Sequence, residues 1–481
     1  MRSQYISKLE EADEVVVYGT GAVSDVLLCQ MEILGMKEKI TAFAVSNICG
    51  IVSKKRGYPI LSIDRAVFLY GGALVIVAAQ SVNHADMEKN LKRVGCTNYC
   101  FTDPGQMISD FYRMLYRHPI DKGKILFMNY NGCGYGCNPK YIAEELLRRK
   151  GIPKLQMIWG VKEHQPSIPE EIRQVKIGTL EYYRELSTAG IWIDNARKSI
   201  DVKKREGQYY IQTWHGAAPM KKVEKDIENH MSLSLINACK NDSDMADIFV
   251  SGSKFYTSLY KNSFWYDGEI IEVGLPRQDV FWNSKSVRNK VLNRYRLDKN
   301  ALLVLYAPTF RDDFSLNACD LDIREVKGAI EGKYNRKSVL LISKHPNVRN
   351  KEYGFASDDF IDVSDYEDFE ELLAATDILI SDYSGCVYDF SAFTHRPVFL
   401  YQKDYRKMHE QRGFYVAFDN MPYPRAESTN DLIREISDFD YEKYHDELCT
   451  FVDQFGNFDD GHASEKVCDR IEALLGAGNN E

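Results

Sequence analysis

Short apolar runs alternate with amphipathic stretches over the first hundred residues. Runs at 14–18, 40–45 and 73–79 have the length and composition of buried strands, and the stretches 24–34 and 83–94 have the spacing of helices. Strands that alternate with helices are typical of βαβ units on a parallel sheet. We therefore predict a small Rossmann-like domain over residues 1–120.

A helical segment of mixed charge at 107–122 separates this domain from the rest of the chain, because a new apolar strand begins at Ile125. Strands and helices then alternate again to the C-terminal region. The predicted strands are residues 125–129, 155–159, 191–193, 209–213, 248–251, 302–306, 339–343, 378–381 and 398–401. We predict two further α/β halves, residues 121–285 and 286–481.

Composition agrees with a globular protein of this size. The chain has 481 residues, of which 44% are hydrophobic and 27% charged, enough for about three domains. The net charge of -9 argues against a general polyanion binder, so we expect no nucleic-acid partner. No stretch reaches the roughly 18 to 20 apolar residues of a membrane span, and no signal peptide is visible. We expect a cytoplasmic protein.

Cysteine usage supports the same compartment. Eleven cysteines, an odd number in a large chain, fit reduced thiols better than a disulfide framework. The pairs Cys96/Cys100 and Cys133/Cys137 are spaced C-x3-C and have no His or Cys partners nearby in the sequence. The sequence therefore predicts no metal site.

A glycine turn follows the first predicted strand. Gly19 and Gly21 occupy two positions of a dinucleotide-binding fingerprint, and Ser24 stands at the third. The second strand ends at Asn47 without the acidic residue that would hold a ribose. A tight turn without a nucleotide is the favoured interpretation, and a nucleotide-binding turn is the alternative. The domain would be regulatory, structural or sugar-nucleotide binding.

A histidine follows the strand predicted at 209–213. His215 lies in the segment Gln-Thr-Trp-His-Gly, and the loop after it carries Lys221. A histidine at the carboxyl end of a strand projects into the crevice where α/β sheets bind ligands, and an imidazole suits proton transfer near neutral pH. His215 is the candidate general base, although a histidine in such a place is more often structural.

Basic residues follow two later strands in the same way. Arg311 follows the strand at 302–306, and Lys344 and His345 follow directly at the end of the strand at 339–343. A guanidinium can hold phosphate oxygens through two hydrogen bonds, and the other two side chains can donate to phosphate as well. The alternative for Arg311 is a surface ion pair with Asp312 or Asp313.

The strand at 378–381 ends in the polar turn Ser-Asp-Tyr-Ser-Gly before a helix. Ser381, Asp382 and Ser384, with Asp389 one turn into the helix, are candidates for binding a diphosphate. Helix capping is the alternative for the turn residues. Further on, Asp404 and Arg412 lie in loops and could hold a polyol hydroxyl or a phosphate.

Together these segments resemble the CDP-glycerol glycerophosphotransferase family of teichoic-acid and capsule synthesis over roughly residues 125 to 475. The resemblance rests on ordered motifs. They are Asn-Pro-Lys-Tyr-Ile at 138–142, Trp-Ile-Asp-Asn-Ala at 192–196, Trp-His-Gly at 214–216, Pro-Thr-Phe-Arg at 308–311, His-Pro at 345–346, Asp-Tyr-Ser at 382–384 with Asp389, and Arg-Gly-Phe-Tyr at 412–415.

The resemblance implies a GT-B-like pair of Rossmann-like domains, preceded here by the small N-terminal one. The C-terminal half would bind the CDP-linked donor. His215 would deprotonate the acceptor hydroxyl, and His345 would stabilise the donor phosphates with Arg311 and the serine-bearing turn. Lys344 and Arg412 would join the donor site, and Lys221 and Asp404 would contact the polyol or the acceptor.

The implied reaction transfers a polyol phosphate from CDP-glycerol or CDP-ribitol to a lipid-linked or oligosaccharide acceptor, and releases CMP. No cofactor is required, although the sequence leaves magnesium open. A lipid-linked acceptor implies peripheral attachment to the inner face of the membrane, through the chain itself or through polymer-synthesis partners. The competing readings are a GT-B nucleotide-sugar glycosyltransferase and a non-catalytic nucleotide-binding regulator.

Overall fold

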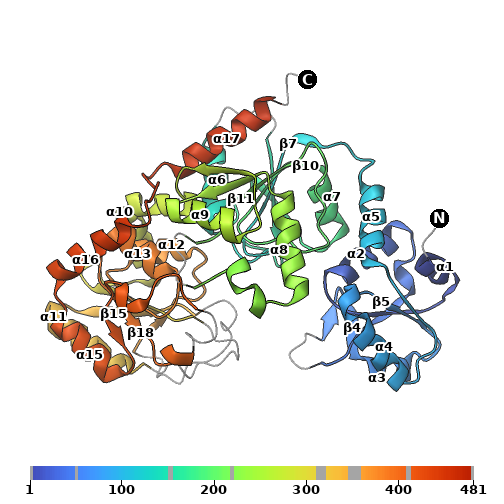
Figure 1. The fold of residues 1–481 in the computed structure, drawn as a ribbon, viewed down its shortest axis with the longest axis horizontal. Helices are drawn as coiled ribbons and strands as arrows, with labels where there is room; N and C mark the ends of the chain where they lie inside the picture. The colour runs from blue at the N-terminus through green and yellow to red at the C-terminus, as the bar shows by residue number, and fades with distance from the viewer. Residues whose placement is uncertain are drawn as a thin grey trace.

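The computed structural model describes residues 4–48, 53–149, 155–216, 221–309, 321–344, 359–407 and 413–477. These residues form three mainly parallel sheets in chain order, each flanked by helices, so the fold is mixed α/β (Figure 1). No helix in these ranges is both long enough and apolar enough to cross a membrane.

The first sheet belongs to the N-terminal part of the chain. Its strands, in spatial order, are β3 (Lys54–Lys55), β4 (Tyr58–Ser62), β2 (Ile40–Val45), β1 (Val15–Tyr18), β5 (Leu74–Val77) and β6 (Tyr99–Phe101). Its helices are α1 (Gln4–Glu11), α2 (Ala22–Ile33), α3 (Ile63–Leu69), α4 (His84–Arg93) and α5 (Pro104–Leu115). Every residue of β1 is buried, as expected for a central strand with both faces covered.

The second sheet is entirely parallel. Its spatial order is β13 (Glu269–Glu272), β12 (Ile248–Ser251), β11 (Tyr209–Gln212), β10 (Ala189–Asp194), β7 (Asp121–Met128), β8 (Gln156–Val161) and β9 (Ile172–Lys176). Helices α6 (Cys137–Arg148), α7 (Leu180–Thr188), α8 (Leu233–Met245) and α9 (Lys254–Ser263) flank it.

The third sheet is also parallel. Its order is β16 (Ile361–Asp362), β15 (Ser338–Ile342), β14 (Leu302–Ala307), β17 (Ile378–Ser381), β18 (Val398–Tyr401) and β19 (Arg425–Ala426). Its helices are α10 (Ser284–Tyr295), α11 (Ile323–Tyr334), α12 (Phe369–Ala375), α13 (Cys386–Thr394), α15 (Thr429–Asp438) and α16 (Tyr441–Asp453). In each sheet the first parallel strand in the chain (β1, β7 or β14) lies in the interior. The next strands are added first on one side of it and then on the other, which is the strand order of a Rossmann fold.

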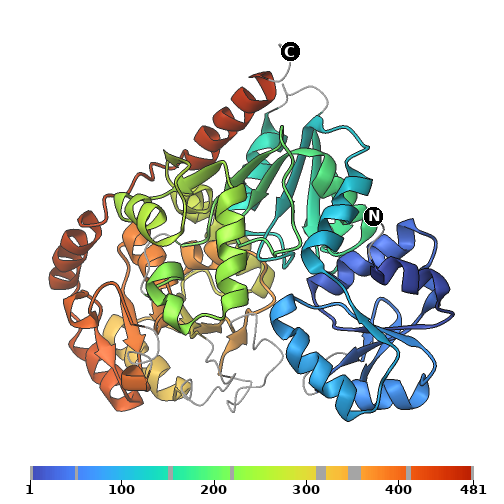
Figure 2. The same cartoon turned by 45° about the vertical axis from the view of Figure 1, so that its right-hand side comes forward.

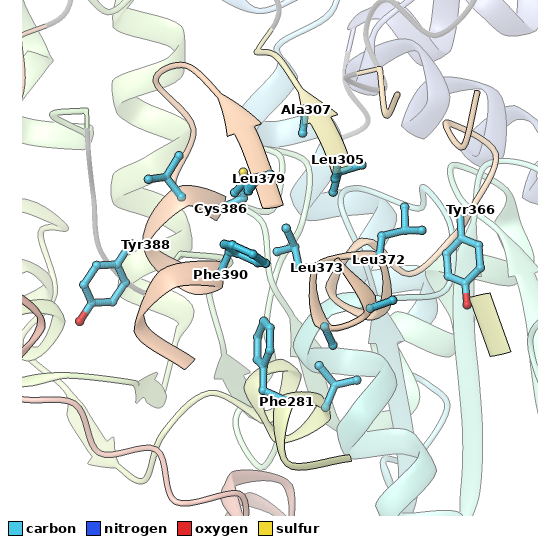
Figure 3. Close-up of a cluster of buried hydrophobic side chains, with 14 of the residues drawn as sticks. Phe281, Leu305, Ala307, Tyr366, Leu372, Leu373, Leu379, Cys386, Tyr388 and Phe390 are labelled. Atoms are coloured by element: carbon cyan, nitrogen blue, oxygen red, sulfur yellow. The ribbon is translucent and has the colours of Figure 1, made fainter. Parts of the chain in front are cut away.

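The core of the third sheet includes residues from outside it. Leu305 and Leu379 on the strands face Leu373 of α12 and Phe390 of α13, and Phe281 of the 3₁₀ segment η4 (Pro276–Asn283) lies beneath them (Figure 3). The rings of Phe281 and Phe393 stack 5.4 Å apart. The segment that connects the second and third sheets is therefore part of the third sheet's core.

Two helices join the parts of the chain. Phe111 of α5 packs edge-to-face on Tyr183 of α7, with ring centroids 5.2 Å apart, so the first two sheets share apolar contacts. The last helix, α17 (Ala463–Ala477), lies against α6 beside the second sheet (Figures 1 and 2). Cys468 donates to the carbonyl of Ile142 there, and Arg149 pairs with Asp469 at 2.7 Å.

The predicted central strands are confirmed, and β2, β12, β17 and β18 have the predicted bounds. The sequence analysis missed the inner strand β4 and the edge strands β3, β6, β9, β13, β16 and β19. Each of them buries at most two residues, so they lack the apolar run that identifies a central strand. The predicted boundary at residue 120 falls immediately before β7.

Candidate functional site

The candidate site lies where the carboxyl edges of the second and third sheets meet. The segment after β11 and the segment after β18 contact each other directly. Lys221 and Phe414 form an antiparallel bridge, and the backbone N–H of Lys222 donates to the carbonyl of Gly413 at 3.3 Å. Residues predicted from separate motifs are therefore neighbours in space.

His215 is held in one orientation by the end of β10. Its Nδ1 lies 2.6 Å from the carbonyl oxygen of Asn195, and its ring stacks on Trp214 at 4.3 Å. A carbonyl only accepts hydrogen bonds, so Nδ1 carries the proton and a neutral ring keeps its lone pair on Nε2. Burial, with a smaller contribution from Arg277 and Arg197, lowers the pKa of His215 to about 4. The imidazole is therefore neutral near pH 7 and can accept a proton at Nε2.

The backbone around His215 is fixed as well. Trp214 has a φ of 52°, a left-handed conformation that costs energy in a non-glycine residue, and its N–H donates to the side chain of Gln212 at 2.9 Å. Asn138, from the predicted Asn-Pro-Lys-Tyr motif, donates to the Trp214 carbonyl at 3.0 Å. A Cβ on Gly216 would lie 2.2 Å from the Tyr256 hydroxyl, so only glycine fits there without a shift.

The residue that accepts from His215 is itself constrained. The side chain of Asn195 accepts from the N–H of Tyr130 at 2.8 Å and donates to Asn129 at 2.7 Å. Next to it, Asp194 forms a fully buried ion pair with Lys198 at 2.8 Å. The Trp-Ile-Asp-Asn-Ala motif therefore positions the carbonyl that sets the tautomer of His215.

A buried ionic cluster joins the two halves behind the site. Arg277 of η4 pairs with Asp389 of α13 at 2.6 Å and with Glu370 of α12 at 2.9 Å. Gln278 donates to the other oxygen of Asp389 at 3.0 Å. Burial raises the pKa of Glu370 to about 7, although the charge of Arg277 opposes that shift. Both oxygens of Asp389 thus have protein partners.

A second set of contacts between the halves starts from the same early motif. Lys140 pairs with Asp368 and Glu371 around the start of α12, and the Tyr141 hydroxyl donates to Asp368 at 2.8 Å. All three charged groups are buried. The motif at 138–142 therefore fastens the second sheet to the third.

The serine-bearing turn lies at the carboxyl end of β17. Ser381 is fully buried and its hydroxyl donates to the carbonyl of Ala307 at 2.7 Å. The carboxylate of Asp382 accepts from the backbone and hydroxyl of Thr309 at 3.0 to 3.1 Å. Ser384 is half-buried, and its oxygen accepts from the N–H of Cys386 at the start of α13. Of the three, Ser384 is the one nearest the surface.

Of the other predicted residues from the transferase motifs, three lie within the described ranges and three do not. Lys344 pairs with Asp362 at 2.8 Å. Asp404 accepts from the Tyr383 hydroxyl at 3.0 Å, and the ammonium of Lys221 lies 6.0 Å from the centre of the same ring, so these two predicted polyol contacts converge. Arg311, His345 and Arg412 lie outside the described residues.

The predicted N-terminal turn forms one wall of a cavity of about 420 Å³ at the carboxyl ends of β1, β2 and β5. A Cβ on Gly19, which has a φ of 126°, would lie 2.4 Å from the Ala78 carbonyl oxygen. Gly21 precedes α2, and the Ser24 hydroxyl donates to the Gly21 carbonyl at 2.7 Å while accepting from Lys55. The serine closes the turn, and nucleotide binding there stays a prediction.

The sequence analysis did not identify Arg277, whose ion pairs join the two halves. Its segment follows no predicted strand, and its partners Glu370 and Asp389 come 93 and 112 residues later. The motif at 138–142 was recognised, but its spacing did not indicate that Asn138 supports the histidine loop.

Comparison with known proteins places this site in a family. The model of the family described as CDP-Glycerol:Poly(glycerophosphate) glycerophosphotransferase matches residues 110–473. The teichoic acid glycerol-phosphate transferase of Staphylococcus aureus is 30% identical over 384 residues, which cover 75% of this chain and 95% of that protein. The teichoic acid poly(glycerol phosphate) polymerase of Bacillus spizizenii is 29% identical over 395 residues, covering 77% and 96%.

Another relative extends further than this chain. The teichoic acid poly(glycerol phosphate) polymerase of Staphylococcus epidermidis is 30% identical over 365 residues, which cover 72% of this chain and 50% of that protein. Among solved structures, a variant of the wall teichoic acid polymerase TagF superposes with a TM-score of 0.68 at 26% identity, covering 84% of this chain and all of that one. The match of the family model to most of the sequence, with these relatives, shows that the chain belongs to the CDP-glycerol:poly(glycerophosphate) glycerophosphotransferase family.

Proposed function

We propose that the protein transfers glycerol phosphate from CDP-glycerol to a hydroxyl of a cell-surface glycopolymer, teichoic acid or capsule, and releases CMP. Family membership and the names of the relatives, which are glycerol-phosphate transferases and polymerases, support the proposal. The observation that carries it furthest is the hydrogen bond from His215 Nδ1 to the Asn195 carbonyl, because it leaves Nε2 as a proton acceptor at the edge of the sheet.

In the proposed reaction, the acceptor hydroxyl gives its proton to Nε2 of His215 as its oxygen attacks the β-phosphorus of CDP-glycerol. A new P–O bond forms, the bond from the β-phosphorus to the bridging oxygen breaks, and CMP leaves with that oxygen. Little covalent chemistry falls to the protein, so catalysis depends on positioning and on stabilising charge at the transferring group.

The charge-stabilising groups are proposed to come from the third sheet. Ser384 and the N-terminus of α13 suit a phosphate oxygen, since the turn is half-buried and leads directly into a helix. Lys344, Arg311, His345 and Arg412 are proposed to act with them on the strength of the family motifs. Ser381, Asp382 and Asp389 are proposed to act indirectly, because their side chains bind Ala307, Thr309 and Arg277.

We propose a GT-B-like arrangement in which residues 121–285 hold the acceptor and residues from 286 onward hold the donor, with residues 1–120 as a separate module. The bridge between Lys221 and Phe414, which brings the two carboxyl edges together, supports it. So does α17, which returns from the third sheet to α6 of the second.

The proposal includes no required cofactor for transfer. CMP release should then be the same with and without added magnesium, whereas an enzyme that requires magnesium would release CMP only when magnesium is present. CDP-ribitol is the alternative donor.

For a lipid-linked acceptor, we propose that the protein works at the inner face of the membrane, through its own surface or a partner.

The test is release of CMP from CDP-glycerol, and in parallel from CDP-ribitol, by purified protein with a lipid-linked acceptor. His215→Ala should lower the rate by about 10²- to 10⁴-fold, the usual contribution of a general base. His230→Ala removes an exposed histidine and is the matched control. Release of a nucleoside diphosphate from a nucleotide sugar, with no CMP from either donor, would instead favour a glycosyltransferase. No turnover of any donor would favour a regulator.

A further inference from the structure

Two histidines and a cysteine converge on the outer side of the third sheet, away from the candidate site. His395 follows the last residue of α13, and His445 and Cys449 lie on α16. One ring nitrogen of each histidine and the Cys449 sulfur all lie within 4.8 Å of one another. Among the described residues, this is the one group of three or more His, Cys, Asp or Glu side chains that meets such a limit.

Contacts within and between α13 and α16 fix the backbone positions from which the three side chains project. His445 and Cys449 are four residues apart on a helix, so they project from the same face, and the sulfur lies 3.8 Å from His445 Nδ1. His395 has a φ of 54°, a left-handed conformation uncommon for a residue other than glycine, and its N–H donates to Ser391 at 2.9 Å. The Tyr444 hydroxyl donates to the Arg396 carbonyl at 3.0 Å and fastens the end of α13 to α16.

The separations suit a small tetrahedral ion. Zinc bonds of about 2.0 to 2.3 Å place two ligand atoms about 3.3 to 3.6 Å apart. The Cys449 sulfur lies 3.8 Å from Nδ1 and 3.9 Å from Nε2 of His445, close to that value, and the centres of the two imidazole rings are 5.2 Å apart at 76°. All three residues are half-buried. Three protein ligands leave one position of a tetrahedral zinc ion for water.

The chemistry of the three groups also favours zinc. Imidazole nitrogen and thiolate sulfur are ligands that zinc prefers over the oxygen donors suited to magnesium or calcium. A histidine must be neutral to bind a metal.

We propose that His395, His445 and Cys449 bind one zinc ion that ties the end of α13 to α16. The ion would have a structural role, because the turn with Ser384 lies at the opposite end of α13, about 13 Å away along nine residues of helix. The same helix carries Asp389, the partner of Arg277. Zinc would thus stabilise the helix through which the third sheet contacts η4.

The first experiment measures zinc uptake by the reduced, chelator-treated full chain, followed by competition with a zinc-binding dye and by metal analysis. The expected result is one zinc per chain. Cys449→Ser should weaken binding by more than about tenfold, since even loss of an outer-shell partner costs that much. Cys133→Ser, which removes an exposed thiol elsewhere, should bind as the wild type does. Absence of uptake by the wild type, or equal binding by Cys449→Ser, would overturn the proposal.

A second measurement needs no variant and remains decisive if Cys449→Ser does not fold. Alkylation of the wild-type chain is followed cysteine by cysteine with mass spectrometry, with and without saturating zinc. Zinc should slow alkylation of Cys449 at least about tenfold, because a metal-bound thiolate is a poor nucleophile, and leave Cys133 unchanged. Cobalt should give a thiolate charge-transfer band that zinc removes. An unprotected Cys449 without that band would rule the site out.

Discussion

At the scale of single residues, the candidate site depends on which nitrogen of His215 carries a proton. The Asn195 carbonyl fixes that proton on Nδ1, and the side chains of Asn129 and Asn195, with the N–H of Tyr130, fix the carbonyl. Partners of this kind determine the tautomer and the ring orientation of a functional histidine. The arrangement presents Nε2 as the base, with a backbone carbonyl as the partner of Nδ1.

The lowered pKa of His215 predicts a shifted pH profile. A general base works when unprotonated, so activity is present above its pKa and is lost as the pH falls through it. Because burial lowers that pKa from 6.5 to about 4, kcat/KM for CMP release should stay constant from about pH 8 to 6 and fall only near pH 4 to 5. The measurement is kcat/KM against pH, with His230→Ala as control.

An acid limb centred near pH 6.5 would contradict this prediction. Unfolding must be followed at each pH, because the same shift affects stability. The unfolded chain binds a proton on this histidine below about pH 6.5 and the folded chain does not, so its contribution to stability decreases as the pH falls from there towards 4. Circular dichroism at each pH separates this loss from a catalytic one.

For single residues, the sequence predicts which side chains lie at the ends of strands but not which partners they contact. His215 was identified because it follows an apolar strand, and Ser384 because it lies in a polar turn before a helix. Asp382 and Asp389 were assigned to the donor phosphates, but the structure pairs them with Thr309 and Arg277. No local pattern distinguishes a carboxylate that faces a ligand from one that faces a buried arginine far along the chain.

At the scale of elements, the turn after β11 is the least tolerant part of the site. Gly216 leads the chain past Tyr256, a side chain that is 3% exposed and so has no room to move away. Trp214 is already in a left-handed conformation. Steric fit therefore fixes the course of the chain immediately after His215.

Gly216→Ala should destabilise the protein by about 1 to 3 kcal/mol, the usual cost of an added methylene in a packed site, and should lower CMP release. Adding Tyr256→Phe removes the oxygen 2.2 Å from the new Cβ and leaves the nearest ring carbon at 3.2 Å, so the double variant should regain part of both losses. Urea unfolding and initial rates measure them.

Gly328→Ala is the control, since a Cβ there meets nothing within 4 Å. It lies within α11 and should stabilise the protein slightly, by up to about 1 kcal/mol. If Gly216→Ala is as stable and as active as the wild type, crowding against Tyr256 does not constrain this turn.

Elements divide into those that the sequence predicts and those that it does not. Central strands such as β12, β17 and β18 are buried on both faces and appear as uninterrupted apolar runs. Edge strands such as β13, with glutamates at both ends, are exposed along one side and carry no such run. Their pairing is decided by the neighbouring strand, which a local pattern cannot contain.

At the scale of the whole molecule, buried ion pairs connect the second and third sheets. Arg277 reaches from η4 to Asp389 and Glu370, and Lys140 reaches from α6 to Asp368 and Glu371. Breaking a buried pair on one side leaves an uncompensated charge, which costs far more than the pair itself contributes. The relative position of the two sheets should therefore be sensitive to single substitutions here.

Asp389→Asn should lower the free energy of unfolding by about 3 to 5 kcal/mol in urea, because Arg277 loses its closest carboxylate. Lys176→Ala, which breaks an exposed pair with Glu163, is the control and should change it by less than about 1 kcal/mol. An Asp389→Asn protein of normal stability with a raised KM for CDP-glycerol would instead place Asp389 in direct contact with the donor.

The arrangement of the sheets was partly predictable. Alternating strands and helices indicated parallel sheets, and the ends of strands gave the edges on which the motifs lie. How the two edges meet depends on contacts such as Lys221 with Phe414 and Arg277 with Asp389, between residues more than a hundred positions apart. Those contacts follow from shape and buried charge in three dimensions, and no period in the sequence encodes them.

The return of α17 to α6 has a consequence for how the protein is made. A ribosome completes the strands of the second sheet well before it synthesises residues 463–477, and domains generally fold in the order of synthesis. During that interval Ile142 and Arg149 lack the contacts that α17 later provides. Part of the surface of α6 therefore stays uncovered in the nascent chain until α17 has been synthesised. This is the stage at which chaperones would protect the chain from aggregation.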